Sequence, residues 1–278
     1  MPSIASSPSE EYDFAVSRNQ GLGQLFYGQV RRNATATAVV DVGISLTYDQ
    51  LHLQASYIAH QLLQESFAFE EPVGIVVQHG VNDIIAQLAI IYAGGSCVPM
   101  DPTLPDQQIQ GRLQRLNTQF LLVDQSNKDR DLPFRKFALE GLVAVAKDKY
   151  PVSTDLEHRT HLIHTSGTTS EPKAVQIAAR SILQVVFHAP FEPVRENDVV
   201  AHVNNSSFDV SLFDVWAPLL RGASIAVLSK TALLDLPVMA EHIDRLGITV
   251  MATTTALLNL AASTYPRAFS KLYLLYWR

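Results

Sequence analysis

Short apolar runs alternate with helical patterns along most of this 278-residue sequence. Runs such as VGIVVQ at residues 73–78 and DVVAHV at residues 198–203 are typical of strands that are buried on both faces. Between such runs lie segments like VNDIIAQLAIIYAGG at residues 81–95, in which apolar residues recur every three or four positions. Because strands that alternate with helices form mainly parallel sheets, the pattern predicts a layered α/β fold with helices flanking the sheets.

Local signals mark the ends of several predicted elements. Thr47 and Gln50 have the spacing of a capping box, which predicts a helix that begins at Tyr48. Gly94 and Gly95 are expected to end the helix that precedes them. By the same patterns we expect further strands at residues 96–100, 120–124, 142–146, 162–165, 173–177, 198–203, 223–228, 248–252 and 272–276. Further helices are expected at residues 106–116, 212–220 and 236–246, and from about residues 178 and 254.

The composition narrows the class of protein. With 47% hydrophobic and 17% charged residues, the chain has enough apolar side chains for one or two cores. A formal net charge of −6 without a cluster of Lys or Arg argues against nucleic-acid and membrane partners. Cys97, the only cysteine, fits a reducing compartment, and no apolar stretch is long enough to span a membrane. We therefore expect a cytoplasmic protein.

Two features indicate how the chain is organised. Residues 1–12 are a polar leader rich in Pro, Ser and acidic residues. Residues 128–149 are the most charged stretch and precede Pro151, which is typical of a surface excursion between two lobes. We place a candidate boundary between lobes at residues 128–155, within one partial domain that covers residues 13–278.

The sequence HTSGTTSEPKAV at residues 164–175 predicts a polar loop between two strands. Its backbone N–H groups and hydroxyls resemble the nests that bind phosphate oxygens, and Lys173 adds a positive charge. The loop is not a Walker A motif, because Ala174 stands where Ser or Thr would hold magnesium. It is not a nucleophile elbow either, since G-x-S-x-G would need glycine at His164 and Thr168. A solvated Ser/Thr turn is the alternative that composition alone favours.

Other candidate sites are weaker. His158, His161 and His164 recur every three residues, but a strand would turn His161 and His164 to opposite faces, so we expect no metal site. GLGQLF at residues 21–26 lacks the third glycine of a dinucleotide-binding fingerprint. Cys97 and Trp216 both lie in apolar patterns and are expected to be buried.

Four motifs in order carry a resemblance to a known family. TSGTTSEPKAV resembles the TSGTTGxPKGV signature of adenylate-forming enzymes, the superfamily of acyl-CoA synthetases, luciferases and the adenylation domains of nonribosomal peptide synthetases. SLTYDQL at residues 45–51 is similar to the first core motif, residues 93–113 to the second, and residues 204–223, built around FDxS, to the fourth. Residues 26–40 also resemble the opening helix and strand of the family. The resemblance implies the large N-terminal part of an adenylate-forming enzyme.

The family joins ATP to a carboxylic acid, giving an acyl-adenylate and pyrophosphate, and is helped mainly by positioning and charge stabilisation. The resemblance therefore implies ATP with Mg2+ as the cofactor. The positions that match the phosphate-binding loop are Thr165, Ser166, Gly167, Thr168, Thr169 and Lys173.

This loop departs from the family pattern at two positions. Ser170 and Ala174 replace glycines, and a side chain at a position that needs a positive φ costs on the order of 1 kcal/mol. Beyond the loop, Ala179 stands where the family often has a histidine.

The FDxS match carries the substrate information. In amino-acid-activating members, the aspartate at the position of Asp209 pairs with the α-ammonium group of the substrate. Val210 and Phe213 match the next pocket-lining positions and imply a partly apolar pocket. The structural alternative is that Asp209 caps the N-terminus of the helix that follows it.

The family continues beyond the last segment present here, into motifs that this sequence does not contain. These are a GGE strand, an NxYGPTE motif, a ribose-binding aspartate and a small C-terminal domain with a catalytic lysine. The resemblance thus predicts a chain truncated before its C-terminal motifs, without a complete catalytic set or the magnesium-binding acid. By itself it is expected to have little or no adenylation activity. A partner protein or a second copy is expected to cover the sheet edge left by the truncation.

We therefore expect an amino-acid-adenylating ligase domain of a nonribosomal peptide synthetase, acting in secondary metabolism. Its partners would be ATP and an α-amino acid whose identity these pocket positions leave open. Two alternatives remain: an acyl- or aryl-CoA ligase of the same superfamily, against which Asp209 argues, and a non-catalytic remnant that binds nucleotide or a partner protein. Binding of ATP without pyrophosphate exchange would favour the remnant.

Overall fold

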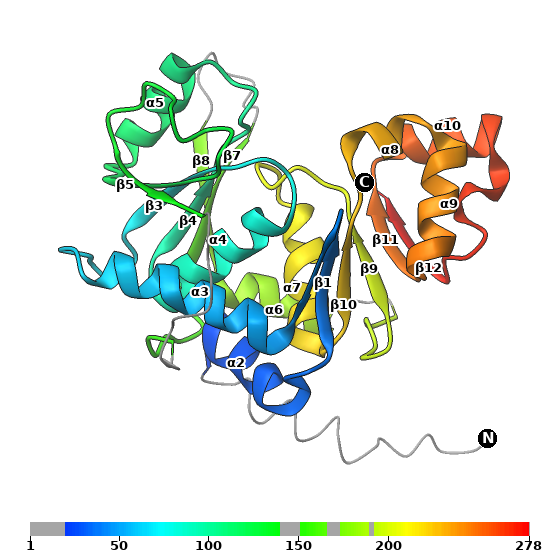
Figure 1. Cartoon of the computed structure of the whole chain (residues 1–278), viewed down its shortest axis with the longest axis horizontal. Coiled ribbons are helices and arrows are strands. Elements are labelled where there is room, and N and C mark those ends of the chain that lie inside the picture. The colour runs from blue at the N-terminus through cyan, green and yellow to red at the C-terminus, as the bar shows by residue number, and fades with distance from the viewer. Residues whose placement is uncertain (1–19, 140–150, 166–172, 189–191, 278) are drawn as a thin grey trace.

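The computed structural model describes residues 20–139, 151–165, 173–188 and 192–277. Within them the chain forms two six-stranded sheets, which Figure 1 shows on either side of a layer of helices. The first sheet has the order β12-β11-β9-β10-β1-β2, and the second has the order β6-β5-β3-β4-β7-β8. Most neighbouring strands are parallel, while β1–β2 and β7–β8 are antiparallel pairs. The predicted layered α/β fold, with mainly parallel sheets flanked by helices, is confirmed.

The strands of the first sheet are β1 (Thr37–Asp41), β2 (Ile44–Thr47), β9 (Val199–His202), β10 (Ser224–Val227), β11 (Val250–Thr253) and β12 (Leu274–Trp277). Those of the second are β3 (Pro72–Val76), β4 (Ser96–Pro99), β5 (Phe120–Val123), β6 (Arg135–Ala138), β7 (Arg159–Thr165) and β8 (Lys173–Ala178). Strand β5, before the candidate boundary at 128–155, β6 within it and β7 after it all belong to one sheet. Residues 140–150, and with them the strand predicted at 142–146, lie outside the described residues.

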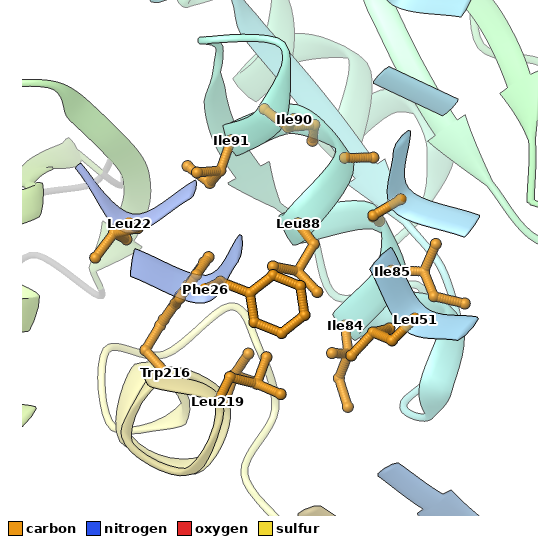
Figure 2. Close-up of a cluster of buried hydrophobic side chains, with 14 of the residues drawn as sticks. Leu22, Phe26, Leu51, Ile84, Ile85, Leu88, Ile90, Ile91, Trp216 and Leu219 are labelled. Atoms are coloured by element: carbon orange, nitrogen blue, oxygen red, sulfur yellow. The ribbon is translucent and has the colours of Figure 1, made fainter. Parts of the chain in front are cut away.

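A layer of helices fills the space between the two sheets and forms the main core with them. It consists of α2 (Leu22–Asn33), α3 (Tyr48–Leu63), α4 (Val81–Tyr92), α6 (Ala179–His188) and α7 (Ser211–Arg221). Figure 2 shows Phe26 of α2 between Leu88 of α4 and Leu219 of α7, with Trp216 beside it. Helix α4 is buried almost all round because it packs on α3 as well as on both sheets.

Two smaller apolar clusters cover the outer faces of the sheets. On the second sheet, Ile109 and Leu113 of α5 (Asp106–Arg115) pack against Leu121 and its neighbours. On the first sheet, Met239 and Ile243 of α9 (Leu236–Leu246) form the outer cluster. The short helices that complete this face are α8 (Lys230–Leu234), α10 (Thr255–Thr264) and η2 (Pro266–Phe269).

The local signals explain where helices begin and end. The capping box is present: the Thr47 hydroxyl accepts a hydrogen bond from the backbone N–H of Gln50, and the Gln50 side chain accepts one from that of Thr47. Gly94, at φ +79°, follows the end of α4 and turns the chain toward β4. The hydroxyl of Tyr48 then ties α3 to the end of α7, because it donates to the carbonyl of Ala223 at 2.7 Å. Together these contacts fix how the helical layer meets the first sheet.

Candidate functional site

A cavity of about 530 Å3 opens where strands of both sheets end. It lies beyond the carboxyl ends of β7, from the second sheet, and of β9 and β11, from the first. Its lining residues are Ile163, His164, Thr165, Val203, Asn204, Asn205, Phe208, Asp209, Val210, Thr253 and Thr254. In α/β folds, ligands bind beyond the carboxyl ends of parallel strands, so this cavity is the candidate site.

The structure brings three of the predicted site residues together. Thr165, Asp209 and Val210 all line the cavity, although Thr165 ends β7 of the second sheet and the other two lie more than 40 positions later, in the segment between β9 and α7. Lys173 is exposed and pairs with Thr165 in the β7–β8 ladder. Phe213 is not among the lining residues; its side chain is half-buried and packs against the main core instead.

The remaining predicted phosphate-binding residues lie outside the described part of the chain. They are Ser166, Gly167, Thr168 and Thr169. Thr165 and Lys173, the described residues on either side of this segment, are paired in the β7–β8 ladder and therefore lie next to each other. Ala174 is in strand β8, and its φ is not positive, so the glycine replacement there adds no backbone strain. Ser170 also lies outside the described residues.

The segment at residues 203–210 forms one wall of the cavity and carries Asp209. Asn205 anchors it, since the Asn205 side-chain amide donates to Asp101 Oδ2 at 2.8 Å and its Oδ1 accepts the backbone N–H of Ser207 at 3.0 Å. Helix α7 begins at Ser211, and the N-cap position belongs to Val210 rather than Asp209. Asp209 is exposed at the cavity wall. Asp209 therefore does not occupy the N-cap position that was the alternative.

His164 gives the cavity a polar group that is neutral at physiological pH. Burial, followed by the positive charges of Arg112 and Arg115 on α5, lowers the pKa of His164 from 6.5 to about 4. Its Nδ1 atom is buried and has no hydrogen-bond partner among the described residues. Phe208, which is 56% exposed, adds an aromatic face to the same cavity. The lining thus combines a carboxylate, neutral polar groups and apolar surface.

Sequence patterns did not identify His164, Asn204, Asn205, Phe208, Thr253 and Thr254 as site residues. A signal for most of them exists, because they directly follow, or end, strands that the periodicity predicts. What the sequence does not reveal is that β7 of one sheet ends opposite β9 and β11 of the other.

The three histidines near β7 have separate surroundings. His158 Nε2 lies 3.0 Å from the carbonyl oxygen of Gly95, and His161 lies between Thr160 Oγ1 and Gln87 Oε1 at 3.0 and 3.2 Å. Among the described residues, no three His, Cys, Asp or Glu side chains are arranged to bind a metal ion. Within that same part of the chain, no helix has the length and apolar character needed to cross a membrane.

Comparison with known proteins shows the family. The AMP-binding enzyme family matches residues 26–274. Aldehyde reductase lnbA of Aspergillus flavus is 67% identical over 98% of this chain, and the nonribosomal peptide synthetase FrzA of a Cladobotryum species is 61% identical over 99%. The chain spans 28% of the length of lnbA and 27% of that of FrzA.

The fold is also shared with a solved structure. The nonribosomal peptide synthetase FmoA3, with α-methyl-L-serine-AMP bound, superposes with a TM-score of 0.83 at 26% identity. The match covers 97% of this chain and 32% of FmoA3. From the matched residues, the two-sheet fold and the cavity at the strand ends, we conclude that this chain belongs to the AMP-binding enzyme family.

Proposed function

We propose that this chain forms part of a site that activates an α-amino acid with ATP as an aminoacyl-adenylate, within a nonribosomal peptide synthetase. The observation that carries the proposal is the position of Asp209, which follows β9 of the first sheet and lines the cavity together with Thr165, at the end of β7 in the second sheet. One wall therefore offers a carboxylate to a substrate cation, while the other leads into the loop whose sequence resembles a phosphate-binding motif. The proposal thus assigns Asp209 to the α-ammonium group and Thr165 to a phosphate oxygen of one ligand.

The proposed chemistry has simple requirements. A carboxylate oxygen of the amino acid attacks the α-phosphorus of ATP, forming the acyl–phosphate bond while pyrophosphate leaves. Asp209 would hold the α-ammonium group by a charge-assisted hydrogen bond and so orient the carboxylate. The Thr165 hydroxyl, and Lys173 at the other end of the loop, would bind phosphate oxygens. Mg2+ would accompany ATP, but Asp209 is the one carboxylate among the described lining residues and is assigned here to the α-ammonium group, so these residues leave no carboxylate for Mg2+.

The relatives support this proposal without defining the substrate. FrzA is described as a nonribosomal peptide synthetase, and the FmoA3 structure holds an amino acid joined to AMP. The fold and the cavity of this chain fit a ligand of the same class. The preference for an amino acid over another carboxylic acid rests on Asp209.

Binding of a stable adenylate analogue tests the proposal. We would titrate the chain calorimetrically with aminoacyl-sulfamoyl adenosines that carry different side chains. At least one should bind, and Asp209→Asn should weaken it about tenfold or more, since a charge-assisted hydrogen bond contributes about 1.5–3 kcal/mol. Asp129→Asn is the matched control, because Asp129 is exposed and does not line the cavity. If no analogue binds but ATP does, the site is that of a nucleotide-binding remnant.

A second function is favoured by lnbA, which is described as an aldehyde reductase. In this case a hydride donor would reduce the adenylated acid to an aldehyde as AMP leaves, and a second hydride would reduce the aldehyde to an alcohol. The adenylate is needed because a free carboxylate resists hydride attack. Both functions use the same cavity and differ in the fate of the acyl group. Product analysis separates the two functions: an aldehyde or an alcohol supports reduction, and a peptide bond supports peptide synthesis.

A further inference from the structure

A buried charged cluster lies directly behind the cavity wall. His202, the last residue of β9, sits between Asp83 in the first turn of α4 and Asp214 in the first turn of α7. His202 Nε2 is 3.6 Å from Asp83 Oδ2, and His202 Nδ1 is 3.5 Å from Asp214 Oδ2. None of the three residues is more than 2% exposed. An imidazole between two carboxylates, each of them at a helix N-terminus, is not part of the adenylation chemistry proposed above.

Both carboxylates also hold the cavity wall. Asp214 Oδ2 accepts hydrogen bonds from the backbone N–H groups of Val203 and Asn204, each at 3.1 Å, and from the Asn204 side chain at 2.9 Å. Asp83 Oδ2 accepts a hydrogen bond from the Ser206 hydroxyl. Asp83 of α4 and Asp214 of α7 therefore both hold the segment at residues 203–206, and His202 lies between the two carboxylates.

Asn204 extends this network to the other side of the cavity. Its side chain also donates to the carbonyl of Ala252 in β11, at 3.0 Å, directly before the lining residues Thr253 and Thr254. The cluster thus connects α4, α7, β9 and β11 behind one wall.

The surroundings of His202 favour its charged form. Burial opposes the charge, but Asp214 and Asp83 outweigh burial and raise the pKa of His202 from 6.5 to about 9. The other titratable group packed on the ring is His79, whose ring centroid is 4.2 Å away. Burial first, and then the positive charge of His202, lower the pKa of His79, so this neighbour stays neutral.

A comparison with His161 shows why His202 is more than a core histidine. His161 is equally buried, but both of its ring nitrogens lie within 3.2 Å of uncharged partners. The ring nitrogens of His202 face only carboxylates, at ion-pair distance, and make no hydrogen bond among the described residues. A neutral ring there would leave two buried carboxylates without a cation.

We propose that His202 is a positioning residue: as a buried cation it holds Asp83 and Asp214 together as acceptors, and through them it fixes the cavity wall at residues 203–207, next to Asp209. The effect on substrate binding rests on the proposed function, whereas the effect on the wall does not.

Nitrogen NMR of the histidine rings tests the charge without any substitution. In the intact chain at pH 7.5, both ring nitrogens of His202 should carry protons, and the signal should titrate only near pH 9. A neutral His202 ring at pH 7.5 would overturn the proposal. The His202 signal is assigned as the one missing from His202→Gln.

Hydrogen exchange tests the positioning. In His202→Gln, amide exchange at residues 203–207 should quicken by about tenfold or more, which corresponds to the loss of about 1.4 kcal/mol of local stability. His158→Gln, a change at another buried histidine, should leave this segment unchanged. Unchanged exchange in His202→Gln would contradict the proposal.

A double substitution separates the effect of the positive charge of His202 from the effect of its packing. His202→Gln leaves two carboxylates without a cation, and adding Asp83→Asn returns the net charge of the cluster to its original value. Protection of Val203 and Asn204, which bond to Asp214, should then recover, while Ser206 stays loosened. If the double variant is no better protected than His202→Gln, the role of His202 is one of packing and the proposal fails.

The adenylate analogue distinguishes the two proposals. If the analogue binds the unmodified chain, His202→Gln should weaken this binding about tenfold or more. This loss matches the local stability that residues 203–207 are expected to lose. If the analogue never binds but the NMR and exchange results hold, the proposed function fails and the positioning role stands.

Discussion

The Tyr48 hydroxyl shows how one buried polar group can hold two layers together. It donates to the carbonyl of Ala223 at 2.7 Å and lies 3.2 Å from that of Pro218, linking α3 to the turn between α7 and β10. Burial raises the pKa of Tyr48 far above its ordinary value, with a smaller contribution from Glu196, so the hydroxyl stays a donor at any physiological pH.

Tyr48→Phe should therefore lower the free energy of unfolding by about 1–3 kcal/mol, because it removes the hydroxyl that donates to the carbonyl of Ala223. Urea denaturation of the purified chain measures this. Tyr57→Phe is the control, because Tyr57 is only half-buried and its hydroxyl accepts one bond from Gln61 within the same helix. Equal losses for both variants would contradict the assigned role of Tyr48.

Among the helices and strands, the predicted boundaries agree best with the observed ones where a helix has capping residues at its ends. The helix expected at residues 236–246 is α9, Leu236–Leu246, where Asp235 caps the start and Gly247 the end. Strands with continuous apolar runs were also predicted, because burial on both faces leaves a strong pattern. Strands β2 and β6 were not predicted, since both lie at sheet edges, are half-exposed and carry polar side chains.

The capping box at the start of α3 gives a prediction for this element. Thr47→Ala removes the hydroxyl that accepts the Gln50 N–H, and should cost about 1 kcal/mol of stability. Thermal denaturation followed by circular dichroism measures the loss. The matched control is Ser45→Ala, two residues earlier in β2, which should change stability by less than about 0.5 kcal/mol. A Thr47→Ala variant as stable as the control would show that the box contributes nothing.

The candidate site was predicted only in part, because several separate elements contribute to it. The FDxS resemblance placed Asp209 and Val210 in a pocket, and both line the cavity. Phe213, three residues after Val210, packs into the core instead. His202 and its carboxylates were not predicted, because they come from three elements that only the tertiary fold brings together.

Across the whole molecule, the helical layer joins two sheets into one core. Trp216 of α7 is fully buried and shares this core with α2 and α4, as Figure 2 shows. Trp216→Ala should lower the free energy of unfolding by about 3–5 kcal/mol, through lost burial and the cavity left behind. Leu234→Ala, at a side chain that is 85% exposed, should stay within about 0.5 kcal/mol. Comparable losses in urea denaturation would contradict this description of the core.

The buried histidines predict how stability depends on pH. Burial, the largest cause, lowers the pKa of His161 to about 3, so the unfolded chain binds a proton there first and stability falls as the pH drops below 6.5. His202 acts in the opposite sense: its raised pKa adds stability that is complete below pH 6.5 and is lost as the pH rises through about 9.

Together these two groups predict a maximum of stability near pH 6.5. Urea midpoints measured from pH 4 to 10 test it: His161→Gln should reduce the loss of stability on the acid side, to which His164 also contributes, and His202→Gln should flatten the alkaline side. An alkaline side that is unchanged in His202→Gln would contradict the charged state assigned to His202.

We propose above that the cavity between the two sheets binds an amino acid joined to AMP, with Asp209 facing the α-ammonium group. The most direct measurement is a calorimetric titration of the chain with the best-binding aminoacyl-sulfamoyl adenosine and with its analogue lacking the α-amino group. Removing the amino group should weaken binding about tenfold or more in the unmodified chain and hardly at all in Asp209→Asn. Equal affinity of the unmodified chain for both compounds would contradict it.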